Sequence, residues 1–152
     1  MAIDGRAFRA QLSSLGDAIH NNAIAAMRAA VAAAVADAKA TTLYNDRTTL
    51  LRSQTDGSVD IEGDGVRGEI HAATKYARFV EGGTRAHVIT GRRGGMLTFQ
   101  INGNWISKRS VNHPGTAPRP FMRHAELVGE QVLDYGLEYY IDFAISKFNA
   151  LG

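Results

Sequence analysis

The sequence predicts an α+β domain in which a mostly antiparallel sheet of two hairpins is flanked by a long N-terminal and a long C-terminal helix. Three patterns predict it: helical apolar spacing near both ends of the 152-residue chain, apolar-polar alternation in its middle, and short glycine-containing turns between the alternating runs. The expected single domain spans 1–152, with a helix over 4–42, a sheet region over 57–112, a short helix near 75–81 and a helix over 120–150.

The first predicted helix begins after Asp4, a residue type suited to the N-cap, and carries Phe8, Leu12, Leu15 and Ile19 at helical spacing. Its second half, AIAAMRAAVAAAVADAKA, has an alanine-rich face. Such a face lets another helix approach closely but buries little area in each contact. We therefore expect this helix to pack against a partner from its own chain or from a neighbour.

Two hairpins are predicted in the middle of the chain. The runs SVDIE and VRGEIHAA are joined by GDG, and MLTFQI and WISKRSV are joined by Asn102-Gly103, a strong turn signal. In the second hairpin, Leu97, Phe99 and Ile101 share the face that we expect to enter the core. Between the hairpins, TKYARFVEGG predicts one or two helical turns ended by glycine, and GRRGG predicts a flexible basic loop.

The last predicted helix starts near Pro118 or Pro120, because proline is favoured in the first turn of a helix. Its apolar stripe begins at Phe121, and Gly136 is expected to be a weak point or kink. The segment before it, HPGTAPRPFMRHA, holds all three prolines of the chain. We interpret this segment as a stiff joint that fixes the approach of the helix.

Charge is unevenly distributed along the chain, whose net charge is +2. Residues 1–81 carry nine basic and ten acidic side chains, residues 82–125 carry seven basic and no acidic ones, and residues 126–152 carry one basic and five acidic ones. A basic block of this kind favours an acidic partner. We expect its basic side chains to contact partner proteins or DNA: Arg85, Arg92, Arg93, Lys108, Arg109, Arg119 and Arg123.

Several kinds of chemistry are not supported by the sequence. Zero cysteines exclude a disulfide, a thiolate nucleophile and a Cys-ligated metal, and the five histidines lack H-x-x-x-H or H-E-x-x-H spacing. No G-x-S-x-G elbow occurs, although a catalytic triad is defined in space and not by order. Glu81 fits either a catalytic base or a residue that pairs with an arginine or caps a turn, and we favour the second because no nucleophile lies nearby. We predict no enzymatic activity, no metal and no cofactor.

Two further patterns bear on nucleotides and membranes. The letters Gly63-Asp-Gly65-Val-Arg-Gly68 match the dinucleotide-binding pattern, but a strand-like run follows where that motif needs a helix. The N-terminus lacks a basic region followed by an apolar core, and no stretch approaches about eighteen uncharged apolar residues. We therefore expect a soluble, unprocessed protein with no membrane partner.

Two segments, YARFVEGGT and HPGTAPRPFMRHA, resemble the tail-component family of tailed bacteriophages, which comprises small neck and tail-completion proteins. The first motif, Tyr-Ala-x-x-Val-Glu-x-Gly-Thr, is matched by Tyr76, Ala77, Val80, Glu81, Gly83 and Thr84. The second, Pro-Gly-Thr followed by Pro-Phe-(Met/Leu) and an alanine, is matched by Pro114, Gly115, Thr116, Pro120, Phe121, Met122 and Ala125. Residues 49–53 resemble a preceding Gly-x-Leu-x-x-Ser element, with threonine in place of glycine. The resemblance covers about residues 45–150 and includes the first helix by position only.

The resemblance implies a non-enzymatic structural virion protein, assembled in the host cytoplasm, that forms an oligomeric ring at the head-tail junction or the head-proximal end of the tail. Its implied partners are connector or head-completion proteins and tail-tube or tail-terminator proteins, with non-specific contact to passing DNA. Six-fold symmetry would match a tail tube. In this setting residues 81–84 are expected to form a buried turn, and the basic block and acidic C-terminal helix offer opposite charges that meet between subunits or within one. The alternative is a small basic DNA-binding or toxin-type module.

Overall fold

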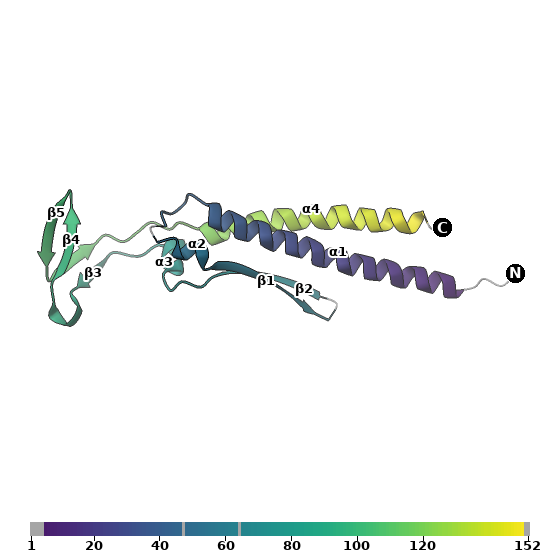
Figure 1. Cartoon of the computed structure of the whole chain (residues 1–152), viewed down its shortest axis with the longest axis horizontal. Coiled ribbons are helices and arrows are strands. Elements are labelled where there is room, and N and C mark those ends of the chain that lie inside the picture. Colours follow the sequence, from purple (N-terminus) through teal and green to yellow (C-terminus); the bar gives the residue numbers. More distant parts are fainter. Residues whose placement is uncertain (1–4, 47, 64, 151–152) are drawn as a thin grey trace. The chain divides into compact units, whose positions relative to one another are not determined.

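The computed structural model describes residues 5–150 except residues 47 and 64, so the N-cap predicted at Asp4 lies outside the described residues. Contacts cluster in two compact units: unit 1 comprises Met1–Lys75 and Phe121–Gly152, and unit 2 comprises Tyr76–Pro120. Long helices near both ends and antiparallel strands in small sheets confirm the α+β class (Figure 1). That the whole chain forms one domain stays a prediction.

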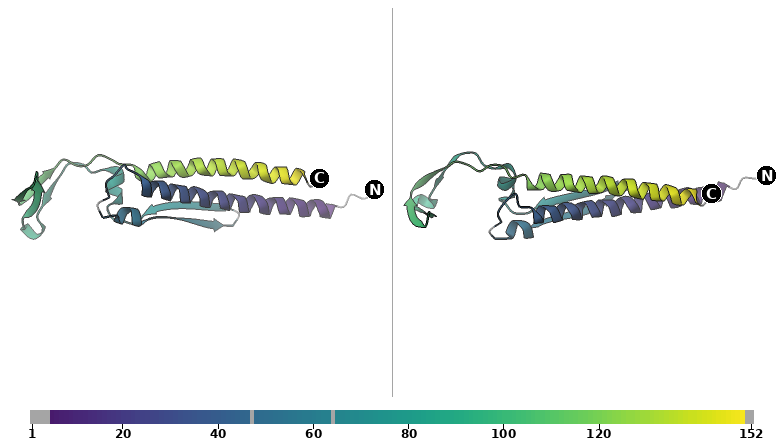
Figure 2. Two further views of the ribbon diagram at one scale, coloured as in Figure 1. Left: turned by 45° about the horizontal axis from the view of Figure 1, so that its top comes forward. Right: turned by 90° about the horizontal axis from the view of Figure 1, so that it is seen from above.

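Unit 1 is built on two long antiparallel helices, α1 (Gly5–Ala40) and α4 (Phe121–Asn149), which lie side by side (Figures 1 and 2). Small side chains form the seam between them. On α1 the seam consists of four alanines at four-residue spacing, each at most 4% exposed: Ala26, Ala30, Ala34 and Ala38. The alanine-rich helix therefore packs against a helix of its own chain, which is one of the two partners the sequence left open.

Two glycines of α4 face this seam. A Cβ added to Gly129 would lie 3.1 Å from the Cβ of Ala34, and one added to Gly136 would lie 3.2 Å from the Cβ of Ala26. Because α4 runs without interruption from Phe121 to Asn149, the prediction that Gly136 is a weak point or kink is wrong. Glycine lets α1 approach closely here, and packing against α1 offsets its low helix propensity.

The first predicted hairpin is confirmed by β1 (Thr55–Glu62) and β2 (Gly65–Ala72), which pair antiparallel from Thr55 opposite Ala72 to Glu62 opposite Gly65. The hairpin can lie close to α1 because two of its residues, Gly57 and Gly68, have no side chain. A Cβ on Gly57 or on Gly68 would lie 2.5 Å or 2.7 Å from a methyl carbon of Val31. The dinucleotide-like glycine pattern thus runs into β2 and is not followed by a helix.

The best-buried part of unit 1 lies where α1 ends and α4 begins, beside a short helix, α2 (Leu50–Ser53), that the sequence did not predict. Phe121, Leu51 and Thr55 are the largest fully buried side chains. The Phe121 ring meets the ring of Tyr44 edge to face, with 4.9 Å between centroids. This core holds the start of α4 against the end of α1.

Arg52 of α2 closes the C-terminus of α1. Its guanidinium donates to the carbonyl oxygen of Thr41 at 2.7 Å and to that of Lys39. The Arg52 N–H donates to Oδ2 of Asp46 at 3.0 Å, and the guanidinium carbon lies 5.3 Å from the centroid of the Tyr44 ring. A cation at this position satisfies carbonyl groups that a helix end leaves unpaired and complements the helix dipole.

Unit 2 consists of short elements: α3 (Ala77–Gly82), β3 (His87–Thr90), a 3₁₀ turn η1 (Arg92–Gly94), β4 (Leu97–Ile101), β5 (Asn104–Lys108) and β6 (Ser110–His113). The short helix and the hairpin of β4 and β5 confirm two predictions. The run WISKRSV is not one strand, however, because β5 ends at Lys108 and β6 pairs with β3. The described strands of the sheet region therefore form three separate two-stranded sheets and not one sheet of two hairpins.

Unit 2 has very little buried surface of its own. Among residues 76–120, all of which are described, only Ala77 is buried. Leu97 and Phe99 are half-buried and Ile101 is 48% exposed, so the expectation that this face of β4 enters the core is wrong. Two-stranded ribbons that bury so little apolar surface are marginally stable by themselves.

Candidate assembly surfaces

The two family-like motifs meet in unit 2 through a pair of threonines. Thr84 and Thr116 form an antiparallel bridge in which the N–H of each donates to the carbonyl of the other at 3.0 Å. Their hydroxyl oxygens are 3.1 Å apart, and Oγ1 of Thr84 also accepts the Thr116 N–H at 3.1 Å. The Gly-Thr of the first motif and the Gly-Thr of the second thus form one reciprocal contact, which we call the Gly-Thr junction.

Two glycines of the Gly-Thr junction, Gly83 and Gly115, are needed for two reasons: a side chain would clash with the facing backbone, and the backbone conformation is left-handed. A Cβ on Gly83 would lie 2.4 Å from the carbonyl oxygen of Thr116, and a Cβ on Gly115 would lie 2.3 Å from that of Thr84. Both glycines have positive φ, +68° and +89°. Any other residue at either position adds a backbone clash to the strain of a left-handed conformation.

A second set of main-chain hydrogen bonds joins the proline-rich segment to the end of α3. The Arg119 N–H donates to the carbonyl oxygens of Val80 at 2.9 Å and Glu81 at 3.2 Å. α4 begins at Phe121, directly after Pro120, as the joint interpretation predicted. The turn of residues 81–84 ranges from half-buried to exposed, so it is not the buried turn we expected.

The remaining motif residues divide between the two units. Ala77 is buried in α3, and Tyr76, which precedes that helix, is 38% exposed. Phe121 and Ala125 belong to unit 1, where both are fully buried, and Met122 beside them is half-buried. The second motif therefore supplies both a turn of unit 2 and the core of unit 1.

Six of the seven candidate contact residues, together with Arg78, make unit 2 strongly basic. Unit 2 carries seven basic and one acidic residue, a net of +6, while unit 1 carries ten basic and fourteen acidic residues, a net of −4. A main-chain hydrogen bond of 3.0 Å from Gly91 N–H to the Arg109 carbonyl brings Arg109 beside Arg92 and Arg93 of η1. The other members are also exposed, and Arg123 differs in lying on α4 of unit 1: Arg85, Lys108, Arg119 and Arg123.

The surface of α4 carries two neighbouring ridges, an acidic one with four-residue spacing throughout and an aromatic one whose spacing is eight residues from Leu127 to Tyr135 and four residues from there on. The acidic ridge consists of exposed carboxylates that form no ion pair with any described residue: Glu126, Glu130, Asp134, Glu138 and Asp142. The aromatic ridge consists of exposed apolar side chains: Leu127, Tyr135, Tyr139 and Phe143. Like charges four residues apart destabilise a helix by about 0.2–0.5 kcal/mol per pair, so a cationic partner would relieve repulsion along the acidic ridge.

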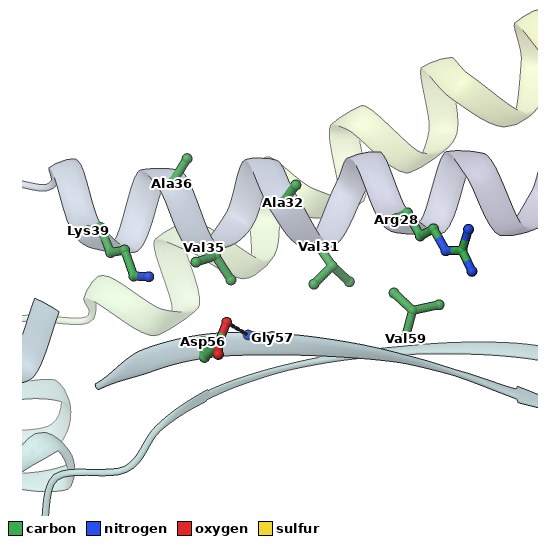
Figure 3. Close-up of a pocket in the computed structure, with 9 residues that line it drawn as sticks. All are labelled: Arg28, Val31, Ala32, Val35, Ala36, Lys39, Asp56, Gly57 and Val59. Carbon is green, nitrogen blue, oxygen red and sulfur yellow. Dashed lines mark hydrogen bonds between the residues drawn. The ribbon is translucent and has the colours of Figure 1, made fainter. Parts of the chain in front are cut away.

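Among the described residues, each unit also has a groove. In unit 1 a shallow groove of about 610 Å³ lies between α1 and β1, with Val31 on its wall and Arg28 and Lys39 as its cations (Figure 3). Asp56 also lines this groove, and its Oδ1 accepts the Gly57 N–H at 2.8 Å (Figure 3). The described lining supplies no hydroxyl or thiol nucleophile and no second carboxylate, so its chemistry suits packing.

The groove of unit 2 has a volume of about 400 Å³. Its apolar lining residues are Phe99 and Ile101 of β4, Ile106 of β5 and Val111 of β6, and its polar ones are Lys108, Ser110 and Asn112. A depression that combines apolar side chains with polar groups and a cation fits a side chain that has an apolar body, a polar tip and an acidic neighbour in the sequence.

Two histidines that are distant in the sequence face each other across β3 and β6. The ring centroids of His87 and His113 are 5.1 Å apart. Nδ1 of His87 donates to the carbonyl of Arg85 at 2.8 Å, and Nδ1 of His113 accepts the Gly115 N–H at 3.1 Å. Spacing along the chain could not reveal this pair. Within the described part of the chain, no three side chains of the metal-ligating types come together.

Comparison with known families identifies the kind of protein that carries these surfaces. Residues 6–83 match the model of a family described as "Bacteriophage HK97-gp10, putative tail-component". The chain belongs to this HK97-gp10-like family. No curated protein and no solved structure matches it.

The HK97-gp10-like match begins within α1 and ends at Gly83 of the first motif. It therefore includes the N-terminal helix, which the sequence resemblance covered by position only, and it leaves out the second motif. As an HK97-gp10-like protein, the chain is a structural component of the phage tail, belongs in the virion and interacts with other phage proteins. None of the described helices is long and apolar enough to cross a membrane.

Proposed function

We propose that the chain is a head-tail joining or tail-completion subunit that forms a homo-oligomeric ring at the head-proximal end of the tail. The observation that supports this most directly is the missing core of unit 2, in which one side chain of residues 76–120 is buried. A unit of this kind gains its stability from a neighbouring surface.

The exposed apolar side chains of unit 2 indicate how much such a neighbour would contribute. Trp105 is 73% exposed, Val88 59% and Met96 55%. Burying a large apolar side chain completely contributes about 1.5–3 kcal/mol. A contact that covers these three side chains therefore contributes an amount comparable to the entropy cost of joining two subunits.

A ring also needs two different contact faces on each copy, because a head-to-tail contact repeats from subunit to subunit until it closes. The basic unit 2 and the acidic ridge of α4 are two such faces. The flat sides of the ring would then meet a connector or head-completion protein and a tail-tube or tail-terminator protein. Six subunits would match the symmetry of a tail tube.

The test is assembly in solution and in the phage. Sedimentation velocity of the purified chain over a range of concentrations should show one discrete oligomer, and electron microscopy should show rings. Phage that lack the gene should yield unattached heads and tails or incomplete tails. A chain that stays monomeric at high concentration, and that does not co-assemble with connector or tail-tube proteins, would refute the proposal.

A second function, binding of DNA, is favoured by the net charge of +6 on unit 2 and by the grouping of Arg92, Arg93 and Arg109. In a ring, these arginines would face the DNA path and attract phosphate without reading sequence. Duplex affinity measured against salt separates the two functions. Six phosphate contacts would give a slope of about −5 in log K against log salt, whereas negligible affinity together with ring formation favours the structural role.

A further inference from the structure

We propose that the subunits join by inserting the aromatic ridge of α4 of one copy into the unit 2 groove of the next copy, with the acidic ridge lying against the basic side chains of that unit 2. This inference rests on the proposed ring and names its contact. The occupant of both surfaces is a second copy of this chain.

The charges of the two surfaces are complementary. Four carboxylates from Glu130 to Asp142 stand unpaired among the described residues of α4, while Arg92, Arg93, Lys108 and Arg109 are exposed on unit 2. Opposite potentials of this kind steer association and specify the partner. The contact also removes the repulsion between carboxylates four residues apart.

The apolar parts are complementary as well. Tyr135 is 74% exposed and Tyr139 59%, and both follow an acidic residue directly in the sequence. The groove in unit 2 has an apolar wall, with Phe99 and Ile106 half-buried, and has Lys108 at its side. Tyrosine rings in this groove would have their acidic neighbours close to the cation. Tyrosine suits such a place, because it combines an apolar body with a polar tip.

The two surfaces match in length. Glu130 and Asp142 are twelve residues apart, which corresponds to about 18 Å along an α-helix. A strand of five residues, such as β4 or β5, is about 17 Å long. One hairpin can therefore lie along the part of α4 that bears both ridges.

Paired charge reversal tests the contact. The first variant is Asp134→Lys/Glu138→Lys on α4, and the second is Arg92→Glu/Arg109→Glu on unit 2; all four side chains are exposed. The first variant turns two repulsive pairs, Glu130 with residue 134 and residue 138 with Asp142, into attractive ones and keeps one like-charge pair between residues 134 and 138, so it should not melt the helix. A control matched to the first variant, Asp17→Lys/Glu62→Lys, makes the same change in net charge at exposed positions that belong to neither surface.

We expect each reversed variant alone to raise the dissociation constant for assembly by at least about tenfold, while the control assembles as the wild type does. An equimolar mixture of the two reversed variants should assemble again, because the basic helix of one then meets the acidic unit 2 of the other. Circular dichroism confirms that each variant is folded.

Three results would overturn the inference. Reversed variants that assemble like the wild type would show that the ring uses another contact. A mixture of folded variants that stays dissociated, while a single chain bearing all four substitutions assembles, would place the charge contact within one subunit. A wild-type chain that is monomeric at every concentration and with every tail protein would refute the ring itself, and this contact with it.

Discussion

Substitution of Gly115 by alanine tests whether the Gly-Thr junction is held by close backbone packing. The new Cβ would lie 2.3 Å from the carbonyl oxygen of Thr84, so the backbone must move. That movement breaks a bridge with two main-chain hydrogen bonds of 3.0 Å, each with a net contribution of about 0.5–1.5 kcal/mol. A left-handed φ of +89° adds about 1–2 kcal/mol of strain for any residue with a Cβ.

Gly103→Ala provides the matched control. Gly103 also has a positive φ, +83°, but no atom lies within 4 Å of an added Cβ. The two variants therefore share the strain of the left-handed conformation and differ by the clash. The difference should be about 1–3 kcal/mol, which corresponds to a loss of roughly tenfold to a hundredfold in amide protection at the bridge.

Hydrogen exchange followed by NMR measures this difference directly at the amides of Thr84 and Thr116. In Gly115→Ala both amides should exchange much faster than in Gly103→Ala, while amides in the seam of α1 and α4 keep their protection. Equal protection of Thr84 and Thr116 in the two variants would refute the reasoning, because the clash would then have no energetic consequence.

Four more substitutions test unit 1, each followed by urea unfolding monitored by circular dichroism. Phe121→Ala should lower the free energy of unfolding by about 3–5 kcal/mol, since the side chain is fully buried against Tyr44; a change under 1 kcal/mol would contradict that core. Gly129→Leu should lower the free energy of unfolding by about 1–3 kcal/mol, because the larger side chain forces α1 away. Gly16→Ala, which has open space around the new Cβ, should raise it by about 0.5–1 kcal/mol. A Gly129→Leu protein more stable than the Gly16→Ala protein would contradict the seam. Arg52→Met should cost about 1–3 kcal/mol by leaving carbonyls at the end of α1 unpaired, and an unchanged midpoint would exclude this capping role.

The elements that the sequence predicted well are those whose signal is local. The apolar spacing of both long helices, and the alternation around a two-residue turn in β4 and β5, depend on neighbours a few residues away. β3 was missed because its four residues carry little signal and its partner, β6, is about twenty residues further along the chain. The role of Gly136 was predicted wrongly because the residue that it packs against, Ala26, is far away in the sequence.

The candidate surfaces likewise include features that the sequence predicts and features that it does not. The basic block and the four-residue spacing of acids in the last helix can be read from the sequence, since charge and helical spacing are properties of the chain itself. The face of Leu97, Phe99 and Ile101 was assigned to a core because alternation predicts a buried side of a strand without saying what buries it. In this chain the described neighbours leave Leu97 and Phe99 half-buried and Ile101 exposed, and Phe99 and Ile101 line a groove.

The sequence by itself thus determined two long amphipathic helices, two hairpins, an uneven charge distribution and a pair of motifs typical of phage tail components. Only the tertiary structure decided that Thr84 and Thr116 bond to each other, that His87 faces His113, and that Gly129 belongs to a helix seam. The physical reason is that periodicity reports which side of an element is apolar, whereas contacts between distant segments depend on backbone paths that bring those segments together.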